Sequence, residues 1–235
     1  MAATRLPGKP LLKINNFSII SHVFKRAEEA NIGEVVVATE DQEILEDVLK
    51  NGGKAVLTQN DHKTGTDRIF EAYKKLDIKN VDYILNLQGD EPDINKDDII
   101  NLNNFMINQD AEFGTLAAKI KDNKMLNNKN VVKVIVENKL EKNNFPKALN
   151  FTRDNLSTDS QNIYHHIGIY SYKIRILEKF VSLDQTNNEK INKLEQLRAL
   201  DNKLKINVAL AKSSPIGVDT KEDYLAIKKI MEYKI

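Results

Sequence analysis

The first half of the chain alternates short β-branched runs with segments of helical period. Strands are predicted at residues 34–39, 54–58 and 81–87. Helices are predicted at about 17–30, after Asp41, at 66–76 and at about 96–108, where apolar residues recur every three or four positions. Strands that alternate with helices of this length are typical of βαβ units. The pattern therefore predicts an α/β fold with a mostly parallel sheet and helices on both faces.

The second half has a different rhythm. Residues 113–120, 131–136, 148–152 and 164–172 read as strands with little helix between them, and the segments 121–130 and 154–162 read as exposed loops. A short helix at 194–200, a strand at 205–211 and a closing helix at 221–233 follow. We expect antiparallel additions to the same sheet, in one domain spanning 1–235 whose strand-rich part at about 113–190 mediates oligomer contacts.

Composition excludes several classes of protein. The 235 residues carry a formal net charge of +1, which argues against non-specific nucleic-acid binding. The absence of Cys excludes disulfides and thiolate chemistry. No apolar run reaches the ~18 residues that cross a bilayer, and the N-terminus lacks the apolar core of a signal peptide. We expect a cytoplasmic protein with no membrane partner.

Acidic residues follow two separate apolar stretches of the chain. Asp90 follows the apolar run 83–87 within the sequence Gln-Gly-Asp-Glu-Pro, and Asp219 follows an apolar stretch near the C-terminus. Open α/β sheets bind ligands at the carboxyl ends of their strands, and Mg²⁺ takes one or two carboxylates. A plain turn at Asp90 and a helix N-cap at Asp219, with Glu222 as its capping-box partner, are the alternatives.

A basic loop lies at the front of the chain, in the sequence Arg5-Leu6-Pro7-Gly8-Lys9-Pro10. Arg5 and Lys9 have the chemistry to bind a triphosphate, although a frayed N-terminus explains the composition equally well. In doubly wound folds the first central strand feeds such a loop, and here that strand is missing. We expect that the natural start lies roughly ten residues upstream of Met1, or that the chain is a fragment.

Three further motifs carry polar chemistry. His62 and the turn at 64–68 lie before a helix and offer hydrogen bonds to a base or a phosphate, or are a simple helix start. His165 and His166 point to opposite faces of a strand and so cannot share one metal. The segment 195–198, Glu-Gln-Leu-Arg, is by itself an ordinary polar helix face.

Taken in order, these blocks resemble the 3-deoxy-manno-octulosonate (Kdo) cytidylyltransferase family. The blocks are 4–10, 36–39, 61–68, 87–92, 131–134, 166–170, 194–198 and 217–219. The resemblance covers nearly the whole chain and implies a Rossmann-like fold of the nucleotide-diphospho-sugar transferase type. It also implies a homodimer, and a Mg²⁺-dependent reaction of CTP with Kdo that gives CMP-Kdo and pyrophosphate for lipopolysaccharide assembly.

The same resemblance assigns roles to individual residues. Arg5, Lys9 and Asp90 would be catalytic, with Thr64 and Gly65 near the cytosine, and Asp90 and Asp219 would hold Mg²⁺. The residues that would surround the sugar acid are Gln88, Arg153, His166, Tyr170, Glu195 and Gln196. No residue is an obvious dedicated base, so positioning and charge neutralisation would dominate.

The chain departs from the family pattern in three places. The first strand with its arginine is absent, no Ile-Pro-Trp stretch follows Arg153, and His165 stands where Arg is common. Two alternative functions therefore stay open. One is a cytidylyltransferase for another acidic sugar, such as 8-amino-Kdo or a sialic acid, and the other is a truncated, non-catalytic nucleotide-binding paralogue.

Overall fold

The computed structural model describes residues 6–120, 122–156 and 162–233. The chain folds into two compact units, which are described separately. The first unit comprises Met1–Lys79, Leu87–Ile100 and Pro215–Ile235, and the second comprises Asn80–Asn86 and Asn101–Ser214. The strand-rich part predicted at 113–190 thus lies within the second unit, and its role in oligomer contacts stays a prediction.

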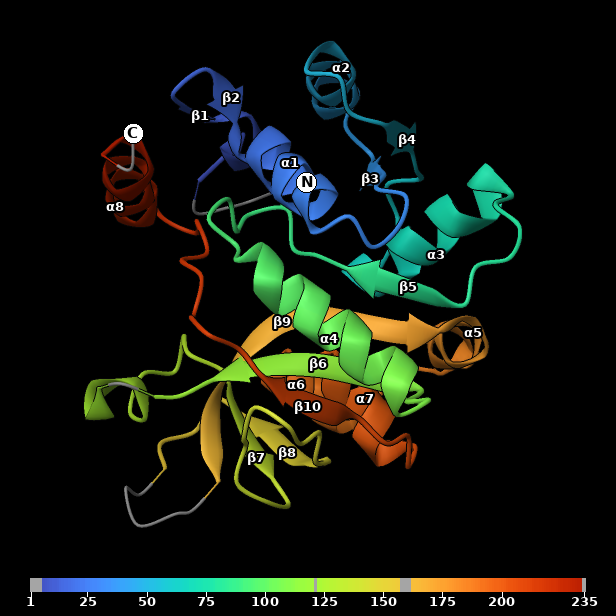
Figure 1. Cartoon of the computed structure of the whole chain (residues 1–235), viewed down its shortest axis with the longest axis vertical. Helices are drawn as coiled ribbons and strands as arrows, with labels where there is room; N and C mark the ends of the chain where they lie inside the picture. Colours follow the sequence, from blue (N-terminus) through green and yellow to red (C-terminus); the bar gives the residue numbers. More distant parts are fainter. Residues whose placement is uncertain (1–5, 121, 157–161, 234–235) are drawn as a thin grey trace. The chain divides into compact units, whose positions relative to one another are not determined.

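The first unit contains the predicted βαβ pattern (Figure 1). Strands β3 (Val37–Thr39) and β4 (Ala55–Leu57) pair in parallel and are connected by helix α2 (Gln42–Lys50). The other elements are η1 (Lys9–Leu11), β1 (Lys13–Ile14), β2 (Phe17–Ser18), α1 (Ile19–Ala30), α3 (Gly65–Leu76), α8 (Lys221–Glu232) and the start of α4 (Lys96–Asn108). The α/β class predicted from the sequence is confirmed.

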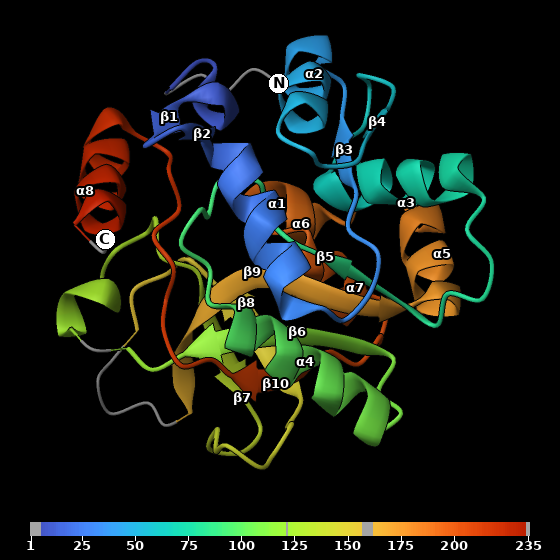
Figure 2. The ribbon, with the colours of Figure 1, turned by 45° about the horizontal axis from the view of Figure 1, so that its top comes forward.

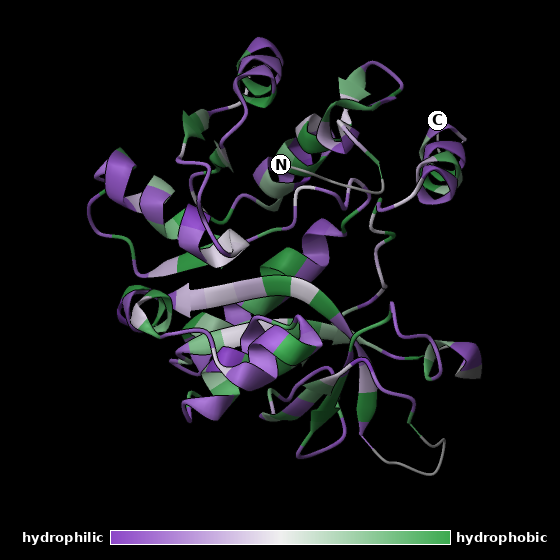
Figure 3. Cartoon of the chain, turned by 180° about the vertical axis from the view of Figure 1, so that it is seen from behind, coloured by the Kyte–Doolittle hydropathy of each residue, from purple (hydrophilic) through white to green (hydrophobic). Residues whose placement is uncertain are grey.

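Polar caps and apolar faces fix the helices of this unit. Asp41 accepts a hydrogen bond from the Glu43 amide and caps α2, as the sequence predicts. Helix α1 packs beside α2 through a core of Ile20, Phe24, Ile44 and Val48 (Figure 2). Helix α8, beside the C label in Figure 3, has hydrophilic and hydrophobic sides, and its Ile227 is fully buried.

The second unit is built on a six-stranded mixed sheet. The strands are β5 (Tyr83–Asn86), β6 (Phe113–Ala118), β7 (Lys133–Val136), β8 (Ala148–Thr152), β9 (Ile163–Lys173) and β10 (Asn207–Leu210). The order is β10-β6-β9-β7-β8, with β5 also paired to β9. The β10–β6 pair is parallel and the others are antiparallel, so the antiparallel strands predicted for the second half are confirmed. Their addition to the same sheet as β3 and β4 is wrong, because β3 and β4 form a two-stranded sheet of their own among the described residues.

A glycine allows α4 to pack closely on β6. A Cβ atom at Gly114 would lie 2.5 Å from Met106 Sδ and 2.8 Å from Phe145 Cζ. Real Cβ atoms do not approach other atoms so closely, so any larger residue would push this contact apart.

Two helices of the second unit were not expected from the sequence. They are α5 (Ile174–Ser182) and α6 (Asn187–Asn192), and they precede the short helix α7 (Gln196–Asp201); a 3-10 turn, η2 (Asn123–Met125), lies elsewhere in the unit. Helix α5 follows β9 directly, and Lys173 at its N-cap makes no side-chain capping bond. The usual start signal is therefore absent from the sequence.

A buried ion pair joins α6 to α7. Arg198 and Glu189 are only 2% and 3% exposed. Arg198 Nε and Nη2 donate to the two carboxylate oxygens of Glu189 at 2.9 and 2.7 Å. The guanidinium also lies 4.7 Å from the centre of the Phe180 ring on α5. This bidentate geometry satisfies both charges and joins the three helices.

An acidic side chain organises the segment before α3. Glu71 accepts hydrogen bonds from the Gln59 amide at 3.0 Å and from the Lys75 ammonium at 2.6 Å, and it contacts His62 Nε2. Partial burial opposes ionisation, but these donors outweigh it and lower the pKa of Glu71 to about 2. His62 is thus held by Glu71.

Of the helices among the described residues, none combines the length and the hydropathy needed to cross a membrane.

We expect Arg198→Met to destabilise the second unit by about 3–5 kcal/mol, because it leaves the Glu189 carboxylate buried without its main partner. Urea unfolding followed by circular dichroism measures the change. The matched control is Lys79→Ala, which removes the exposed Lys79–Asp77 pair and should cost about 1 kcal/mol or less. Equal losses in the two variants would contradict the structural role of the buried pair.

The pKa of Glu71 predicts an acid-sensitive contribution to stability. The folded-state pKa of Glu71 lies below its ordinary value of 4.5. The contribution of Glu71 to the free energy of unfolding is therefore complete above about pH 4.5 and declines as pH falls toward 2. Glu71→Gln should therefore be less stable than the wild type at pH 7 and approach it on acidification. Urea unfolding at pH 7, 4 and 3 tests this, and a difference independent of pH would overturn it.

Candidate functional site

One lysine and two aspartates meet in the first unit. Lys9 Nζ lies 2.7 Å from Asp90 Oδ2 and 3.1 Å from Asp219 Oδ1, and donates a hydrogen bond to each. Lys9 is nearly buried, with 8% of its surface exposed. The side chains of Asp90 and Asp219 are 30% and 52% exposed. These residues are 81 and 210 positions apart from Lys9 in sequence, and the fold brings all three together.

Local structure aims these side chains at one another. Gly8 adopts a left-handed conformation, with φ of 69°, and the chain turns there into η1, which begins at Lys9. Val218 N donates to Asp90 O at 2.9 Å, so the main chain holds the two acidic segments side by side. The basic loop at the front of the chain therefore turns tightly at Gly8.

The capping alternative for Asp219 is wrong by one residue. The N-cap of α8 is Thr220, and its capping-box partner is Asp223 rather than Glu222. Thr220 Oγ1 and Asp223 satisfy the first turn reciprocally, so the Asp219 carboxylate is not used as the cap. Asp219 faces Lys9 instead. The turn alternative for Asp90 is correct for the backbone, because residues 89 and 90 form a turn, and the Asp90 side chain also makes an ion pair with Lys9.

Burial and neighbouring charges shift the pKa values of Lys9 and Glu91 in this cluster. Burial lowers the pKa of Lys9, but the Asp90 and Asp219 carboxylates outweigh it, and the pKa stands above its ordinary value. Burial, together with the neighbouring Asp90 charge, raises the pKa of Glu91 to about 8. Glu91 is therefore mostly neutral at pH 7, and Asp90 and Asp219 carry the negative charge.

The donor set fits a hard divalent cation. Within the described ranges, no group of three or more His, Cys, Asp or Glu gathers in a way that could hold a metal alone. Asp90 and Asp219 already hold one cationic group, the Lys9 ammonium, between their oxygens. A pair of carboxylates that leaves other positions to phosphate and water is the arrangement that Mg²⁺ favours.

The other residues predicted for the nucleotide are described only in part, and those that are described lie at the start of α3. Arg5 lies outside the described residues. Thr64 is the N-cap of α3, and its hydroxyl donates to Asp67 at 2.9 Å within a capping box. Gly65 begins the helix and is exposed. The helix-start interpretation of this turn is thus correct, and a role toward a nucleotide stays a prediction. Gln88, which is predicted for the sugar acid and not for the nucleotide, is half-buried two residues before Asp90.

The second unit brings several residues predicted for the sugar close together. His166 and Tyr170 lie on β9 with ring centroids 5.5 Å apart. Burial, reinforced by His165 and Arg153, lowers the pKa of His166 to about 3. Burial and the nearby Glu195 raise the pKa of Tyr170 well above its usual range. His166 and Tyr170 are therefore both neutral hydrogen-bonding groups.

The remaining predicted residues flank this pair. Glu195 is the N-cap of α7, and Gln196, its first residue, is 4% exposed. Arg153 follows β8 and is half-buried, and its Nη1 donates to the carbonyls of Lys129 and Asn130 at 3.2 Å each. His165 turns away from His166 and reaches Ser214 Oγ at 3.0 Å, as the alternation along a strand predicts.

Sequence reasoning missed two buried polar residues of this unit, Lys133 and Thr115, which are both 0% exposed. Lys133 Nζ donates to the carbonyls of Asn128 and Arg153 at 3.1 Å each, and so supports the backbone of Arg153. The sequence does carry a signal for Lys133, because a charged residue stands inside the apolar run 131–136. Thr115 carries no such signal, because Thr is an ordinary strand residue.

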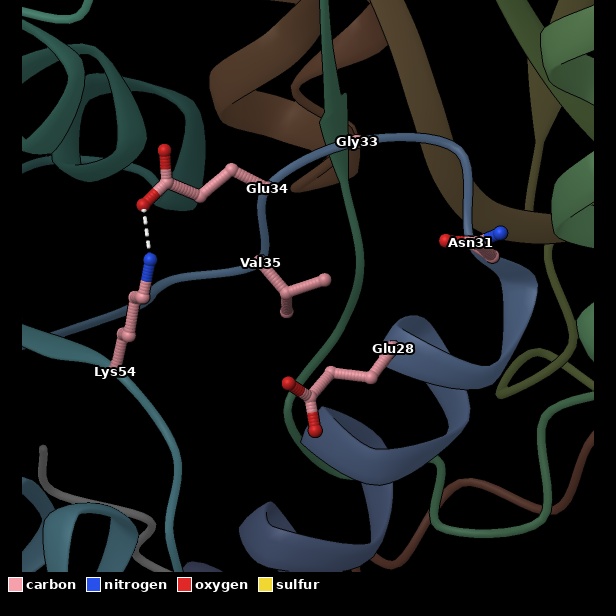
Figure 4. A pocket seen from close by; sticks show the side chains of 6 residues that line it. All are labelled: Glu28, Asn31, Gly33, Glu34, Val35 and Lys54. Atoms are coloured by element: carbon pink, nitrogen blue, oxygen red, sulfur yellow. Dashed lines mark hydrogen bonds and ion pairs between the residues drawn. The ribbon is translucent and has the colours of Figure 1, made fainter.

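A shallow pocket elsewhere in the first unit contains none of the predicted residues. It lies at the end of α1, and the Lys54–Glu34 ion pair, at 2.6 Å, crosses one side of it (Figure 4). Its lining residues are Glu28, Asn31, Gly33, Glu34, Val35 and Lys54.

Comparison with known proteins identifies the family of this chain. A sequence model of the family described as "Cytidylyltransferase" matches residues 1–206. The chain is 42% identical, over 97% of its length and 94% of the relative's, to a 3-deoxy-manno-octulosonate cytidylyltransferase of Thermodesulfovibrio yellowstonii. It is 43% identical to the protein of the same name from Rhodopseudomonas palustris (strain BisB18), over 99% of this chain and 95% of the relative.

Solved structures give the same result. The structure of CMP:2-keto-3-deoxy-manno-octonic acid synthetase complexed with CTP matches with a TM-score of 0.88 and 33% identity, over 99% of this chain and 95% of that chain. An apo UDP-glucose pyrophosphorylase matches with a TM-score of 0.73 at 12% identity, which indicates a shared fold alone. By sequence and by structure, the chain belongs to the cytidylyltransferase family, with the 3-deoxy-manno-octulosonate cytidylyltransferases as its relatives.

Proposed function

We propose that this protein is the cytidylyltransferase that joins CTP to Kdo. The anomeric hydroxyl oxygen of Kdo forms a bond to the α-phosphorus of CTP. The bond from that phosphorus to the oxygen bridging the β-phosphate breaks, and the hydroxyl proton passes to solvent. CMP-Kdo and pyrophosphate are the products. The observation that carries this proposal is the cluster of Lys9, Asp90 and Asp219, in a chain whose relatives bear that activity in their names.

Lys9 and its loop would bind the triphosphate. The Lys9 ammonium is buried and stays charged, because the pKa-raising effect of Asp90 and Asp219 exceeds the effect of burial. A fixed positive charge stabilises the negative charge that develops on the transferred phosphoryl group. Arg5 would add a bidentate contact, and Thr64 and Gly65 would lie near the cytosine, as the family resemblance implies.

Asp90 and Asp219 would hold Mg²⁺. When bound, the ion neutralises phosphate charge and orients the leaving group. Glu91, neutral near pH 7, adds little repulsion beside Asp90 and keeps the cluster from gathering a third full negative charge. The main-chain bond from Val218 to Asp90 would keep the spacing of the two carboxylates fixed.

The neutral pair His166 and Tyr170 would receive the sugar acid, with Glu195 and Gln196 of the same unit around it. Gln88, in the first unit, would also bind the sugar acid, as the family resemblance implies. Arg153, held by Lys129 and Asn130, is a natural partner for the substrate carboxylate. A homodimer, a cytoplasmic location and a place in lipopolysaccharide assembly remain predictions that the family resemblance carries.

The proposal predicts that the purified protein, given CTP, Mg²⁺ and Kdo, releases pyrophosphate. The rate with Kdo should exceed the rates with 8-amino-Kdo and with a sialic acid at equal concentration. A faster reaction with either of those would favour the alternative acidic sugar. No release with any sugar would favour the binding-only paralogue. A coupled phosphate assay measures every arm.

Each of the variants Asp90→Asn and Asp219→Asn should lower kcat/KM at least about a hundredfold, because each removes a carboxylate that would hold Mg²⁺ and that pairs with Lys9. The fold should persist, since the capping box and the Val218–Asp90 main-chain bond need neither carboxylate. Pyrophosphate release and circular dichroism give the two readouts. The control Glu222→Gln changes an exposed acid on α8 and should keep the wild-type rate. Wild-type rates in either aspartate variant would refute the metal assignment.

A further inference from the structure

A buried threonine contacts the imidazole of His166. Thr115 lies on β6 and is fully buried. Its Oγ1 is 3.0 Å from His166 Nε2, 2.7 Å from the carbonyl oxygen of Ile169 and 3.3 Å from that of Ile167. One hydroxyl therefore meets a ring nitrogen and two backbone acceptors, all on β9.

An irregularity in the sheet creates this arrangement. Thr115 pairs with Tyr170 while Leu116 pairs with Ile167, so one step along β6 is matched by three along β9. Such a bulge interrupts the ladder and redirects carbonyls and side chains that would otherwise alternate regularly. Here it turns the Ile167 and Ile169 carbonyls toward the Thr115 hydroxyl and leaves His166 beside it.

The positions of the protons follow from this geometry. A hydroxyl has one proton, and a carbonyl oxygen has none to give. The shortest contact, 2.7 Å to Ile169 O, is a good hydrogen bond only if Thr115 donates to it. Thr115 Oγ1 must then accept from His166, so the ring carries its proton on Nε2.

The surroundings keep the ring in one form. Burial, together with His165 and Arg153, holds the pKa of His166 near 3, so the ring is neutral at physiological pH. A neutral ring protonated at Nε2 has a lone pair at Nδ1. Phe151 meets the ring edge-on at 4.9 Å between centroids, and Tyr170 lies 5.5 Å away. These contacts limit how the ring can rotate.

We propose that Thr115 is a positioning residue that fixes His166 as the Nε2–H tautomer, so that Nδ1 accepts a hydrogen bond from a hydroxyl of the sugar acid. This inference rests on the proposed function. A lone pair cannot bind a carboxylate, so the acid group belongs to Arg153 and His166 selects for a hydroxyl. Thr115 acts through His166 and contacts no substrate itself.

Two variants of Thr115 distinguish the effect of its hydroxyl group from the effect of its side-chain shape. Thr115→Val replaces the hydroxyl with a methyl group, and Thr115→Ser keeps the hydroxyl. Nitrogen-15 NMR of histidine-labelled protein reports which nitrogen of each of the four histidines is protonated, and His166→Asn assigns the signal. The wild type and Thr115→Ser should show the Nε2–H form, and Thr115→Val should show a mixture or the Nδ1–H form.

Kinetics provide the second readout. Thr115→Val should raise the KM for Kdo about tenfold and leave the KM for CTP unchanged, because only the sugar contact has lost its fixed acceptor. Thr115→Ser should keep both KM values at the wild-type level. Circular dichroism of each variant verifies folding.

Two results would overturn the proposal. One is an Nδ1–H tautomer in the wild type, and the other is a Thr115→Val protein with the wild-type tautomer and the wild-type KM for Kdo. Failure of the wild type to turn over any sugar would instead contradict the proposed function. The tautomer, read without substrate, would in that case still decide for or against the role of Thr115.

Discussion

The ion pairs that Lys9 makes with Asp90 and Asp219 hold the first unit's site together. Two carboxylates at the surface would repel each other, and a buried ammonium would be costly without partners. Lys9 offsets the repulsion between the two carboxylates, and they compensate the burial of its ammonium. These contacts bring together three segments: the loop at the front, the corner after 83–87 and the segment before α8. A polar cluster of this kind favours folds in which all three groups meet, because Lys9 would otherwise be buried without a partner.

Much of the fold could be predicted from the sequence, because hydrophobic periodicity and the residues that cap helices or form turns are local signals. The helix at 96–108 and the strand at 148–152 were predicted with their observed boundaries, and Asp41 was identified as an N-cap. Helix α5 was missed because no capping residue announces it after β9. The N-cap of α8 was placed one residue early, since Asp219 and Thr220 are both good caps and the choice depends on Lys9, which is distant in sequence.

The candidate site could be predicted only where a residue type is conspicuous. Asp90 and Asp219 stand out as isolated acids after apolar runs, and the structure brings them together. Thr115 and Glu189 do not stand out, because their importance comes from burial beside a partner that the sequence cannot reveal. The family resemblance assigns His166 to the sugar, but the tautomer of its ring depends on a bulge between β6 and β9 that has no sequence signature beyond Gly168.

The hydrogen bond from Val218 N to Asp90 O involves main-chain atoms only, so the spacing of the two acidic segments does not depend on the charges of their side chains. The distance between the two acidic segments is set by peptide groups, which every substitution except proline retains. The side chains at 90 and 219 can therefore change without moving the scaffold that presents them. The charges at positions 90 and 219 can thus change one at a time, while the main-chain frame that holds the two segments stays the same.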